Sequence, residues 1–408
     1  MTALTSKTGA DSDQGDSDVA ARRYRLAQRR RTLGFTQDSL AERLGVDPTT
    51  IRRWESGETE SGPQPWLRPK LARYLQVSAD QLDELLAETD AEDTASDERL
   101  AHALRHPGTI DLVAVARLRE QVHGLAERYD HARSTSLLAE TGQCLGQVAF
   151  LRVHTPTSRV CRELYAPEAE SATLMGQLVW DASQRRDHAS AHSYFDQAIK
   201  AARQLHDPAA EGLALLRKSF VVLYGEKDPH AGLNLTMQTA ETTRRTSHVL
   251  SGLALLHAAE AHAMLGQQAD CEKALSVADT YFDWIDATDA ALDLFSPTQQ
   301  GRLAGSCYLF LDKAKQAQPI LEATAQELRD RSKSRAIVLG NLSLAYIRQC
   351  KLDEAAAILH QAIDVIELTW GGGGLNIVFG ACRELQPWWQ VEAVRDVYER
   401  VLTLIAAK

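Results

Sequence analysis

The most concentrated set of side chains with a chemical use is a group of cations near the N-terminus. Residues 20–79 contain twelve Lys and Arg against six Asp and Glu, a local net charge of +6, whereas the whole chain of 408 residues carries −10. The flanking segments are acidic, with −3 over residues 1–19 and −8 over residues 80–100. Guanidinium and ammonium ions gathered in this way neutralise phosphates, so nucleic acid is the expected partner of this segment.

No catalytic constellation can be assembled from the sequence. The serine-hydrolase, zinc-protease and kinase signatures are absent. Gly371–Gly374 lacks the lysine and hydroxyl residues of a phosphate-binding loop, which favours a flexible hinge. His188 and His192 lie four residues apart without a third ligand, and the six Cys contain no Cys-x-x-Cys pair. We therefore expect no enzyme, no metal and no cofactor, and we expect the cysteines to be buried thiols.

Short helices separated by turns must position the N-terminal cations. Thr36 begins one helix, and Gly45 allows a sharp turn after it. Asp47 and Pro48 begin the next helix as its cap and first residue, and Gly57 ends it. Apolar residues mark the buried faces of the two helices: Leu40, Ala41, Leu44, Ile51 and Trp54. Two short helices about a tight turn form a helix-turn-helix.

Composition divides the chain into four parts. With 24 Gly and 12 Pro and few alternating β-branched runs, the fold is expected to be all-α. Residues 1–18 hold almost no large apolar side chain and are predicted to be a disordered tail. The helix-turn-helix module is predicted over 19–86, an acidic linker over 87–100, and a helical body over 101–408. No apolar run of about 18 residues and no secretory leader occurs, so a cytoplasmic protein without membrane contact is expected.

Long amphipathic helices recur in pairs after residue 100. A small residue followed four positions later by Phe or Leu marks one helix of each pair, and successive marks lie 40, 40, 46 and 38 residues apart. These repeat marks are Ala191/Phe195, Ala231/Leu235, Cys271/Leu275, Ala317/Leu321 and Ala355/Leu359. Helix-hairpin repeats of this length predict an α-solenoid. The final helix, with apolar residues from Val394 to Ile405, is expected to cap the solenoid or to contribute to a dimer face.

The segment Thr36–Gly57, TQDSLAERLGVDPTTIRRWESG, resembles the Cro-type (XRE) phage-repressor helix-turn-helix family. The shared pattern has Thr-Gln at the start of the first helix, Leu-Ala within it, Leu-Gly at the turn, and Ile-x-x-Trp-Glu-x-Gly in the second helix. The similarity runs from Ala20 to Leu86 and implies a five-helix domain that binds DNA. We expect a homodimer on operator DNA, because one module contacts too little DNA for tight specific binding.

The resemblance also assigns contacts to residues. It places Thr49 and Arg53 at base-reading positions of a helix in the major groove, where Arg53 would donate to guanine O6 and N7 and Thr49 would contact a thymine methyl. It pairs Arg30 with Glu55, while the spacing of Trp54 from Ile51 predicts that Trp54 is core. The other DNA contacts are expected mainly at phosphates, and they involve Gln37, which also contacts a base, Thr50, Arg52, Arg68 and Lys70, and more weakly Arg29 or Arg31.

The helical body resembles tetratricopeptide repeats, most clearly over residues 339–362. Such repeats bind ligands on the concave face made by the first helix of each hairpin. Projecting the repeat alignment onto that helix gives the candidate effector residues Trp180, Phe220, Tyr224, Glu260, Met264, Arg302 and Phe310. An aromatic, apolar hollow with one acid and one base suits a small organic molecule or an extended peptide. The alternative is that neighbouring helices simply bury these residues.

The two modules together resemble a class of large regulators typical of actinobacteria and, more distantly, the peptide-sensing RRNPP regulators. The combination predicts a DNA-binding transcriptional regulator whose repeats sense a small molecule or peptide, mediate dimerisation, or both. Two alternatives remain open: a DNA-bound scaffold whose repeats recruit a protein partner, and a phage-type antitoxin or maintenance factor. A partner found by pull-down, without stabilisation by small molecules, would favour the scaffold, and an adjacent toxin gene would favour the antitoxin.

Overall fold

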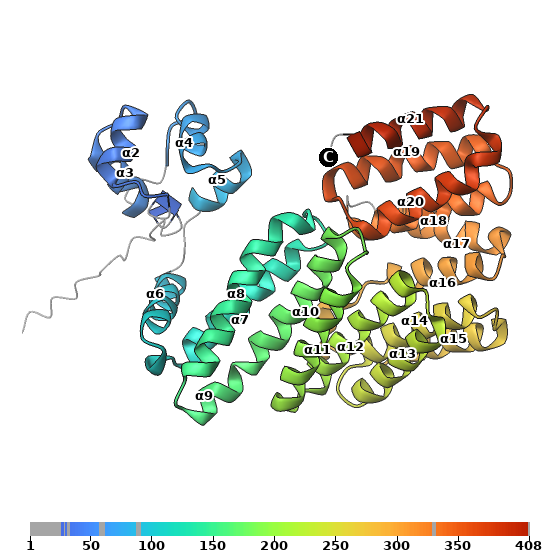
Figure 1. Ribbon diagram of the computed structural model, residues 1–408, viewed down its shortest axis with the longest axis horizontal. Helices are drawn as coiled ribbons and strands as arrows, with labels where there is room; N and C mark the ends of the chain where they lie inside the picture. Colours follow the sequence, from blue (N-terminus) through green and yellow to red (C-terminus); the bar gives the residue numbers. More distant parts are fainter. Residues whose placement is uncertain are drawn as a thin grey trace, which may run out of the picture. The chain divides into compact units, whose positions relative to one another are not determined.

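The computed structural model describes residues 26–27, 29–30, 33–56, 62–86, 91–328 and 332–406. Helices are the only regular elements in these ranges, so the all-α class predicted from the composition is confirmed (Figure 1). The chain forms two compact units, Met1–Ala101 (unit 1) and His102–Lys408 (unit 2). The predicted disordered tail, residues 1–18, lies outside the described residues. None of the helices in the described ranges is long and apolar enough to cross a membrane.

Unit 1 is built from short helices around one apolar core. Its helices are α2 (Gln37–Leu44), α3 (Pro48–Ser56), α4 (Arg68–Leu75) and α5 (Ala79–Leu86), and the helical residues 26–27 and 29–30 precede them. The core takes side chains from all of these segments, among them Leu26, Leu40, Ile51, Trp54, Leu71, Leu75 and Leu82. Helices this short are marginal in isolation, so burial of this shared core holds them in place.

The segment predicted as an acidic linker is helical over most of its length. Helix α6 (Ala91–Arg105) begins inside that segment and continues past the division between the two units. It contains neither Gly nor Pro, and Leu100 and Ala103 are buried. The acidic charge that indicated a linker does not prevent a helix, because Ala, Leu, Glu and Arg all have high helix propensity. Residues 87–90 lie outside the described ranges.

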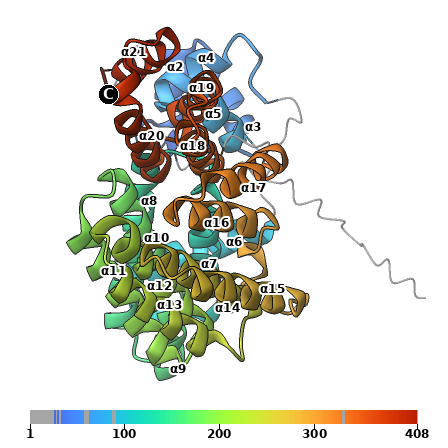
Figure 2. The same ribbon diagram turned by 90° about the vertical axis from the view of Figure 1, so that its right-hand side faces the viewer.

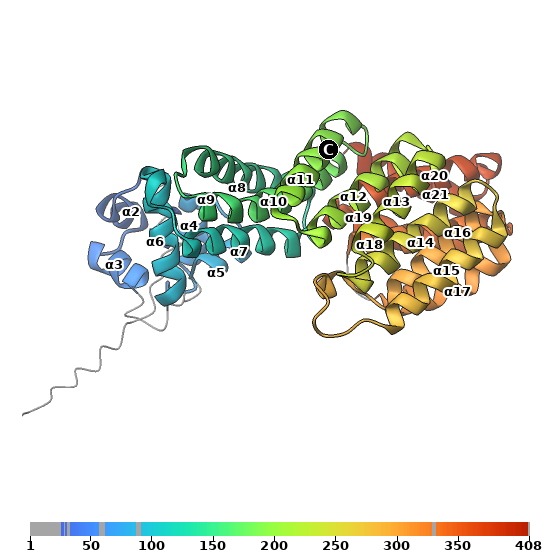
Figure 3. The same cartoon turned by 90° about the horizontal axis from the view of Figure 1, so that it is seen from below.

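Unit 2 is a row of helix hairpins preceded by three further helices (Figures 1 and 3). The preceding helices are α7 (Leu112–Arg128), α8 (Ser134–His154) and α9 (Ser158–Glu163). The hairpins are α10 (Tyr165–Ala182) with α11 (His188–Leu205), α12 (Pro208–Phe220) with α13 (Pro229–Thr243), α14 (His248–Met264) with α15 (Gln268–Asp283), α16 (Thr298–Phe310) with α17 (Ala314–Glu327), α18 (Lys333–Ile347) with α19 (Leu352–Thr369), and α20 (Gly372–Leu385) with α21 (Glu392–Ala406). A π-helix, η2 (Val221–Glu226), follows α12, and short 3-10 turns are η1 (Pro107–Thr109), η3 (Leu292–Leu294) and η4 (Gln386–Trp388).

The two helices of each hairpin are buried differently. The first helices bury residues around most of their circumference, as α14 does, whereas second helices such as α15 and α21 bury one face. First helices also contact the first helices of neighbouring hairpins, α14 with α16 and α18 with α20. A helix that is apolar all round is enclosed by its neighbours. The first helices therefore form an inner layer, and the second helices form an outer layer.

The repeat marks read from the sequence all lie in the outer helices, one each in α11, α13, α15, α17 and α19. Their large residues pack closely against the paired inner helix. A Cβ atom on Gly176 of α10 would lie 2.8 Å from the ring of Phe195, and one on Gly305 of α16 would lie 2.5 Å from Leu321. The predicted helical-hairpin repeat is confirmed, and in two of the hairpins a mark residue, Phe195 or Leu321, packs closely on a glycine of the paired inner helix.

The row of hairpins closes on itself, because α10 contacts α20 (Figures 1 and 2). The buried carboxylate of Asp181 in α10 pairs with Nζ of Lys333 in α18 at 3.1 Å. Asp181 also accepts a hydrogen bond from the N–H of Gly372 at 2.9 Å. The hydroxyl of Ser134 donates to Asp181 at 2.8 Å and accepts from Lys333 at 2.7 Å. This closing network joins hairpins that are almost 200 residues apart in the sequence.

The glycine run that predicts a flexible hinge forms the start of α20 instead, with Gly372, Gly373 and Gly374 buried. A Cβ atom on Gly374 would lie 2.7 Å from Cβ of Ala336, and one on Gly372 would lie 3.0 Å from the carbonyl oxygen of Asp181. The hinge prediction is therefore wrong. These glycines are small so that α20 can approach α10 and α18 closely.

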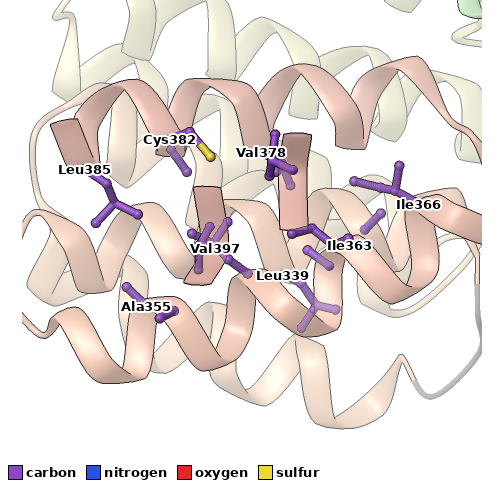
Figure 4. Close-up of a cluster of buried hydrophobic side chains, with 14 of the residues drawn as sticks. Leu339, Ala355, Ile363, Ile366, Val378, Cys382, Leu385 and Val397 are labelled. Atoms are coloured by element: carbon purple, nitrogen blue, oxygen red, sulfur yellow. The ribbon is translucent and has the colours of Figure 1, made fainter. Parts of the chain in front are cut away.

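The C-terminal hairpins enclose an apolar core between α18, α19, α20 and α21 (Figure 4). Leu339, Val378 and Val397 are among its fully buried side chains. The opposite face of α21 carries Leu402 and Ile405, which are 64% and 49% exposed. The final helix thus covers the end of the repeats with one face and leaves apolar side chains exposed on the other.

Candidate functional site

The turn between α2 and α3 follows from local hydrogen bonds. The hydroxyl of Thr36 accepts from the N–H of Ser39 at 3.0 Å, which caps the start of α2. Gly45 ends α2 with φ of 76°, a left-handed conformation that glycine adopts without strain. The N–H groups of Gly45 and Val46 donate to the carbonyl of Ala41 at 2.9 and 3.1 Å. This closed turn sets the angle at which α3 leaves α2.

Asp47 begins α3. Its carboxylate accepts from the hydroxyl of Thr49 at 2.6 Å and from the N–H of Thr49 at 2.8 Å, and these bonds lower the pKa of Asp47. The hydroxyl of Thr49 is therefore used within the helix. The contact left to this side chain is through its methyl group, which is the group that the expected thymine contact requires. Thr50 is half-buried, and its N–H donates to the carbonyl of Asp47 at 2.8 Å.

Helix α3 has one buried and one exposed face. Ile51 and Trp54 are 1% and 5% exposed and pack in the core of unit 1, as predicted for Trp54. Thr49, Arg52 and Arg53 are exposed. With 3.6 residues per turn, these three positions lie within about 100° of one another. The apolar face fixes the helix, and the opposite face presents two guanidinium groups and a threonine.

A charged network around Glu55 locks α3 to the rest of unit 1. Arg30 donates to both carboxylate oxygens of Glu55, from Nε at 2.7 Å and from Nη2 at 3.1 Å, and both residues are buried. Arg30 also donates to the carbonyl of Phe35, and Gln37 donates to Glu55, each at 2.7 Å. The ion pair implied by the family resemblance is thus present. The side-chain amide of Gln37 belongs to this network, so its expected phosphate contact is left to its backbone N–H in the first turn of α2.

The two expected phosphate contacts on α4 have partners within unit 1. Arg68 forms an ion pair with Asp83 at 2.8 Å, and both side chains are well exposed. Lys70 donates from Nζ to the carbonyl of Leu44 at 3.1 Å, at the end of α2. The Arg68 pair is a surface contact of small energy that a phosphate can replace. Lys70 fastens α4 to α2, a role that sequence spacing does not show.

Arg29 also has a structural contact in place of the weak phosphate contact expected of it. Its guanidinium donates to the carbonyls of Leu75 at 2.9 Å and Gln76 at 3.1 Å. These carbonyls end α4 and have no partner within the helix, so a cation beside them is stabilising. Arg31, the other residue named for a weak phosphate contact, lies outside the described residues.

The seven candidate effector residues all lie on inner helices or on the π-helix: Trp180 in α10, Phe220 in α12, Tyr224 in η2, Glu260 and Met264 in α14, and Arg302 and Phe310 in α16. The structure brings four of them together with two residues that the sequence projection missed. We call this set the inner-face cluster, and it consists of Arg217, Phe220, Tyr224, His257, Glu260 and Arg302. Trp180 packs beside it, against Phe220 and Tyr224.

Hydrogen bonds join three members of the inner-face cluster. The hydroxyl of Tyr224 donates to the carboxylate of Glu260. Nδ1 of His257 lies 2.5 Å from the Tyr224 oxygen and 3.2 Å from the Glu260 carboxylate. The hydroxyl of Ser306 in α16 also bonds to Glu260. Tyr224 reaches this position from a π-helix, a rare conformation that is frequent at functional sites.

The pKa values of these three groups follow from burial and from their mutual contacts. Burial lowers the pKa of His257 and outweighs the opposite effect of Glu260, so the imidazole is neutral near pH 7. Burial alone would raise the pKa of Glu260, but hydrogen bonds from His257, Ser306 and Tyr224 lower it. Burial and the adjacent carboxylate raise the pKa of Tyr224. The trio therefore holds one negative charge.

The aromatic ring of Phe220 links this trio to a guanidinium. The ring centroid lies 4.3 Å from that of His257 and 5.9 Å from that of Tyr224. The central guanidinium carbon of Arg217 lies 5.4 Å from the same centroid. Arg217 and His257 stand three residues from Phe220 and Glu260, on the same helix faces. The i, i+3 spacing was the signal that could have found them.

Two candidate residues lie away from the inner-face cluster. Met264 and Phe310 end α14 and α16, about 6 Å and 12 Å along the helix axis from Glu260 and Arg302. Phe310 is 47% exposed.

The histidine pair examined as a possible metal site has other contacts. Nε2 of His188 lies 2.9 Å from the carbonyl of Arg185, and Nε2 of His192 lies 2.9 Å from the carboxylate of Glu226. Over the described part of the chain, no group of three or more His, Cys, Asp or Glu could hold a metal ion.

Comparisons with known proteins give one family match. Residues 26–82 match the helix-turn-helix family model. No curated protein matches the chain. Among solved structures, PlcR of Bacillus thuringiensis, in complex with the peptide PapR7 and DNA, is 17% identical, with 65% of this chain and 95% of that chain covered, at a TM-score of 0.28. A score this low carries no argument. The family match and the geometry of α2, its turn and α3 agree that residues 26–82 form a helix-turn-helix domain.

Proposed function

We propose that this protein is a sequence-specific DNA-binding transcriptional regulator that binds operator DNA as a homodimer. The observation that carries the proposal is the exposed face of α3. Thr49, Arg52 and Arg53 share that face, while the apolar face and the Glu55 network hold the helix in place. A helix that is fixed on one side and cationic on the other is suited to the major groove.

The contacts follow from the chemistry of each side chain. Arg53 donates to O6 and N7 of a guanine, and the methyl of Thr49 contacts a thymine methyl. Arg52 neutralises a phosphate at the edge of the groove, and the first-turn N–H groups of α2 bind another. Arg68 exchanges its exposed partner Asp83 for a phosphate. The acidic balance of the rest of the chain confines this attraction to unit 1.

A dimer is required because one such module contacts only a few base pairs. Two copies related by a two-fold axis read an inverted repeat whose half-sites lie about one helical turn, or a multiple of it, apart. Unit 2 then acts as the sensor of this regulator. A ligand that binds one arrangement of the dimer better than another changes the affinity for the operator.

The experiment is selection of operators from random double-stranded DNA by the full chain, together with genome-wide mapping of its sites. We expect an enriched inverted repeat bound by two chains. The variant in which Thr49, Arg52 and Arg53 are all alanine should enrich nothing, whereas Arg73→Ala, which changes an exposed arginine on α4, should select the same repeat. A wild-type chain that enriches no sequence overturns the proposal, and enrichment of a single half-site overturns the dimer.

A further inference from the structure

Two cations of the inner-face cluster have no ion-pair partner in the part of the chain that the structure describes. Arg217 in α12 and Arg302 in α16 come from inner helices on either side of α14, and both are partly buried. Neither guanidinium forms an ion pair with a carboxylate of the described residues. Burial lowers the pKa of Arg217, and repulsion from Arg302 acts in the same direction, while Tyr129, the largest effect after burial, and Asp130 act in the opposite direction. Holding like charges near each other, away from water, costs free energy, which the attraction of Asp130 and the ring of Phe220 offset only in part.

The nearest acid of the cluster is already committed. Glu260 is 3% exposed and accepts hydrogen bonds from Tyr224, His257 and Ser306. The carboxylate oxygens accept these hydrogen bonds, so the negative charge of Glu260 is stabilised by Tyr224, His257 and Ser306. The cluster therefore has two guanidinium cations against one carboxylate, which already accepts three hydrogen bonds.

The polar atoms left without partners beside the cluster are donors. Nε of Arg217 is buried and has no hydrogen-bond partner among the described residues. Nε1 of Trp180 is also buried without a hydrogen-bond partner among the described residues. Trp180 is 5% exposed and packs with Phe220 and Tyr224. Buried donors without acceptors are rare in native proteins and require an explanation. Unpaired donors and unpaired cations in one place require the same partner, an anionic acceptor.

We propose that the inner-face cluster binds a small organic anion, with its carboxylate or phosphate between Arg217 and Arg302 and its apolar part against Phe220. Guanidinium groups suit this role because they donate in a planar fork that matches the oxygens of both anions. The ring of Phe220 and the indole of Trp180 supply an apolar surface beside the charges. Arg217 and Arg302 lie on α12 and α16, with α14 between them, so one ligand contacts three hairpins at once.

This inference rests on the proposed function, because it identifies the ligand class of the sensor. The geometry also explains how the ligand would act. Ligand binding draws α12 and α16 together against α14, within a row of hairpins whose ends are joined at Asp181 and Lys333. A change in curvature is then transmitted around the closed row rather than lost at a free end.

The test measures binding of four probes to the full chain by isothermal titration calorimetry: phenylacetate, phenyl phosphate, inorganic phosphate and the neutral amide phenylacetamide. We expect phenylacetate or phenyl phosphate to bind at least tenfold more tightly than phenylacetamide. Inorganic phosphate separates charge recognition from packing against the ring. The double variant Arg217→Gln, Arg302→Gln should lose this preference for anions. The matched control Arg244→Gln changes an exposed arginine on the outer side of unit 2 and should keep it.

The outcomes separate this inference from the proposed function. Equal binding of the anionic and neutral probes, equal loss in the double variant and the control, or no binding by any anionic probe overturns the anion site. Binding of a fifth probe, the uncharged peptide N-acetyl-Gly-Gly-Phe amide, without binding of any anionic probe would also overturn it in favour of a peptide. Operator binding is measured on the same samples. Anion binding without any effect on DNA would leave the site in place and remove its role as a sensor.

A thermal melt followed by circular dichroism checks that each variant is folded. The comparison of phenylacetate with phenylacetamide is made on the wild-type chain, so it remains decisive if the double variant fails to fold.

Discussion

The two units differ in whether their buried or partly buried arginines pair with a carboxylate. In unit 1, each of the three guanidinium nitrogens of Arg30 donates a hydrogen bond, two to Glu55 and one to the carbonyl of Phe35. In unit 2, Arg302 repels the charge of Arg217, and neither arginine forms an ion pair with a carboxylate of the described residues. A compensated buried charge fixes a structure, because every group it needs is supplied by the chain. A cation without such compensation is held ready for a group from outside.

The contrast is not a general difference between the units, because unit 2 also contains a compensated network. Lys333 is buried, and burial lowers its pKa, but Asp181 pairs with it and Ser134 accepts a hydrogen bond from it. This network holds the closed row of hairpins. The same unit thus keeps one set of charges for its fold and leaves another without partners.

The largest effect is expected from breaking the compensated pair of unit 1. Arg30→Ala leaves the carboxylate of Glu55 buried without its cation, which costs about 3–5 kcal/mol. Hydrogen exchange of the α2 and α3 amides in the full chain measures this loss, with Arg73→Ala as the exposed control. A loss below about 1 kcal/mol would mean that the pair is incidental to the fold of unit 1.

Arg53 is the third kind of arginine, exposed on α3 and expected to meet its partner on DNA. Arg53→Ala should weaken operator binding by about 1–3 kcal/mol and relax the preference at one base pair, because a bidentate contact to guanine is lost. Arg52→Ala should weaken binding to all sequences alike and lower the salt dependence. Titration of the selected operator and of its single-base variants checks both results. An unchanged base preference in the Arg53 variant would show that Arg53 is not a base reader.

Removing one of the two arginines of the inner-face cluster should stabilise the chain, whereas removing Arg30 should destabilise it. Arg302→Gln relieves repulsion with Arg217, so the ligand-free chain should gain about 0.5–2 kcal/mol, as changes at strained functional sites commonly do. Urea unfolding followed by circular dichroism measures the gain against Arg244→Gln, which should change nothing. Destabilisation by Arg302→Gln would mean that this cation has a compensating partner and that the contrast between the units is false.

Local patterns were sufficient to predict unit 1. The turn at Gly45, the cap at Asp47 and the apolar spacing of Ile51 and Trp54 are all readable within a few residues. The positions of Arg29 and Lys70 were not, because each contacts a carbonyl at the end of a helix distant in sequence. A cation seen in a sequence can therefore belong to a helix end as easily as to DNA.

Unit 2 was predictable in its repeat and less so in its site. The repeat marks stand at a similar place in each outer helix, and two of their large residues, Phe195 and Leu321, pack closely on glycines of the paired inner helix. Projection of the repeat alignment onto the inner helices predicted Phe220 and Glu260. It did not include Arg217 and His257, which lie on the same helix faces. Closure of the row depends on contacts across almost 200 residues, so the role of the glycines at the start of α20 could not be read locally.

The smallest expected effect tests the neutral member of the inner-face cluster. The pKa of His257 is lowered in the folded chain, whereas in the unfolded chain it is near 6.5. As pH falls below about 6.5, His257 becomes protonated in the unfolded chain but not in the folded chain. The free energy of unfolding therefore decreases as the pH decreases in this range. The contribution of Glu260, whose folded pKa is lowered, is lost only at more acidic pH.

In His257→Asn the slope of stability against pH between pH 5 and 6.5 should therefore decrease, by at most about 1.4 kcal/mol per pH unit. Urea unfolding at several pH values measures this, and the exposed control His230→Asn should keep the wild-type slope. An unchanged slope in His257→Asn would show that His257 accepts its proton in the folded chain as readily as in the unfolded one. The trio with Tyr224 and Glu260 would then not be a closed group with one negative charge that leaves Arg217 and Arg302 without an anion.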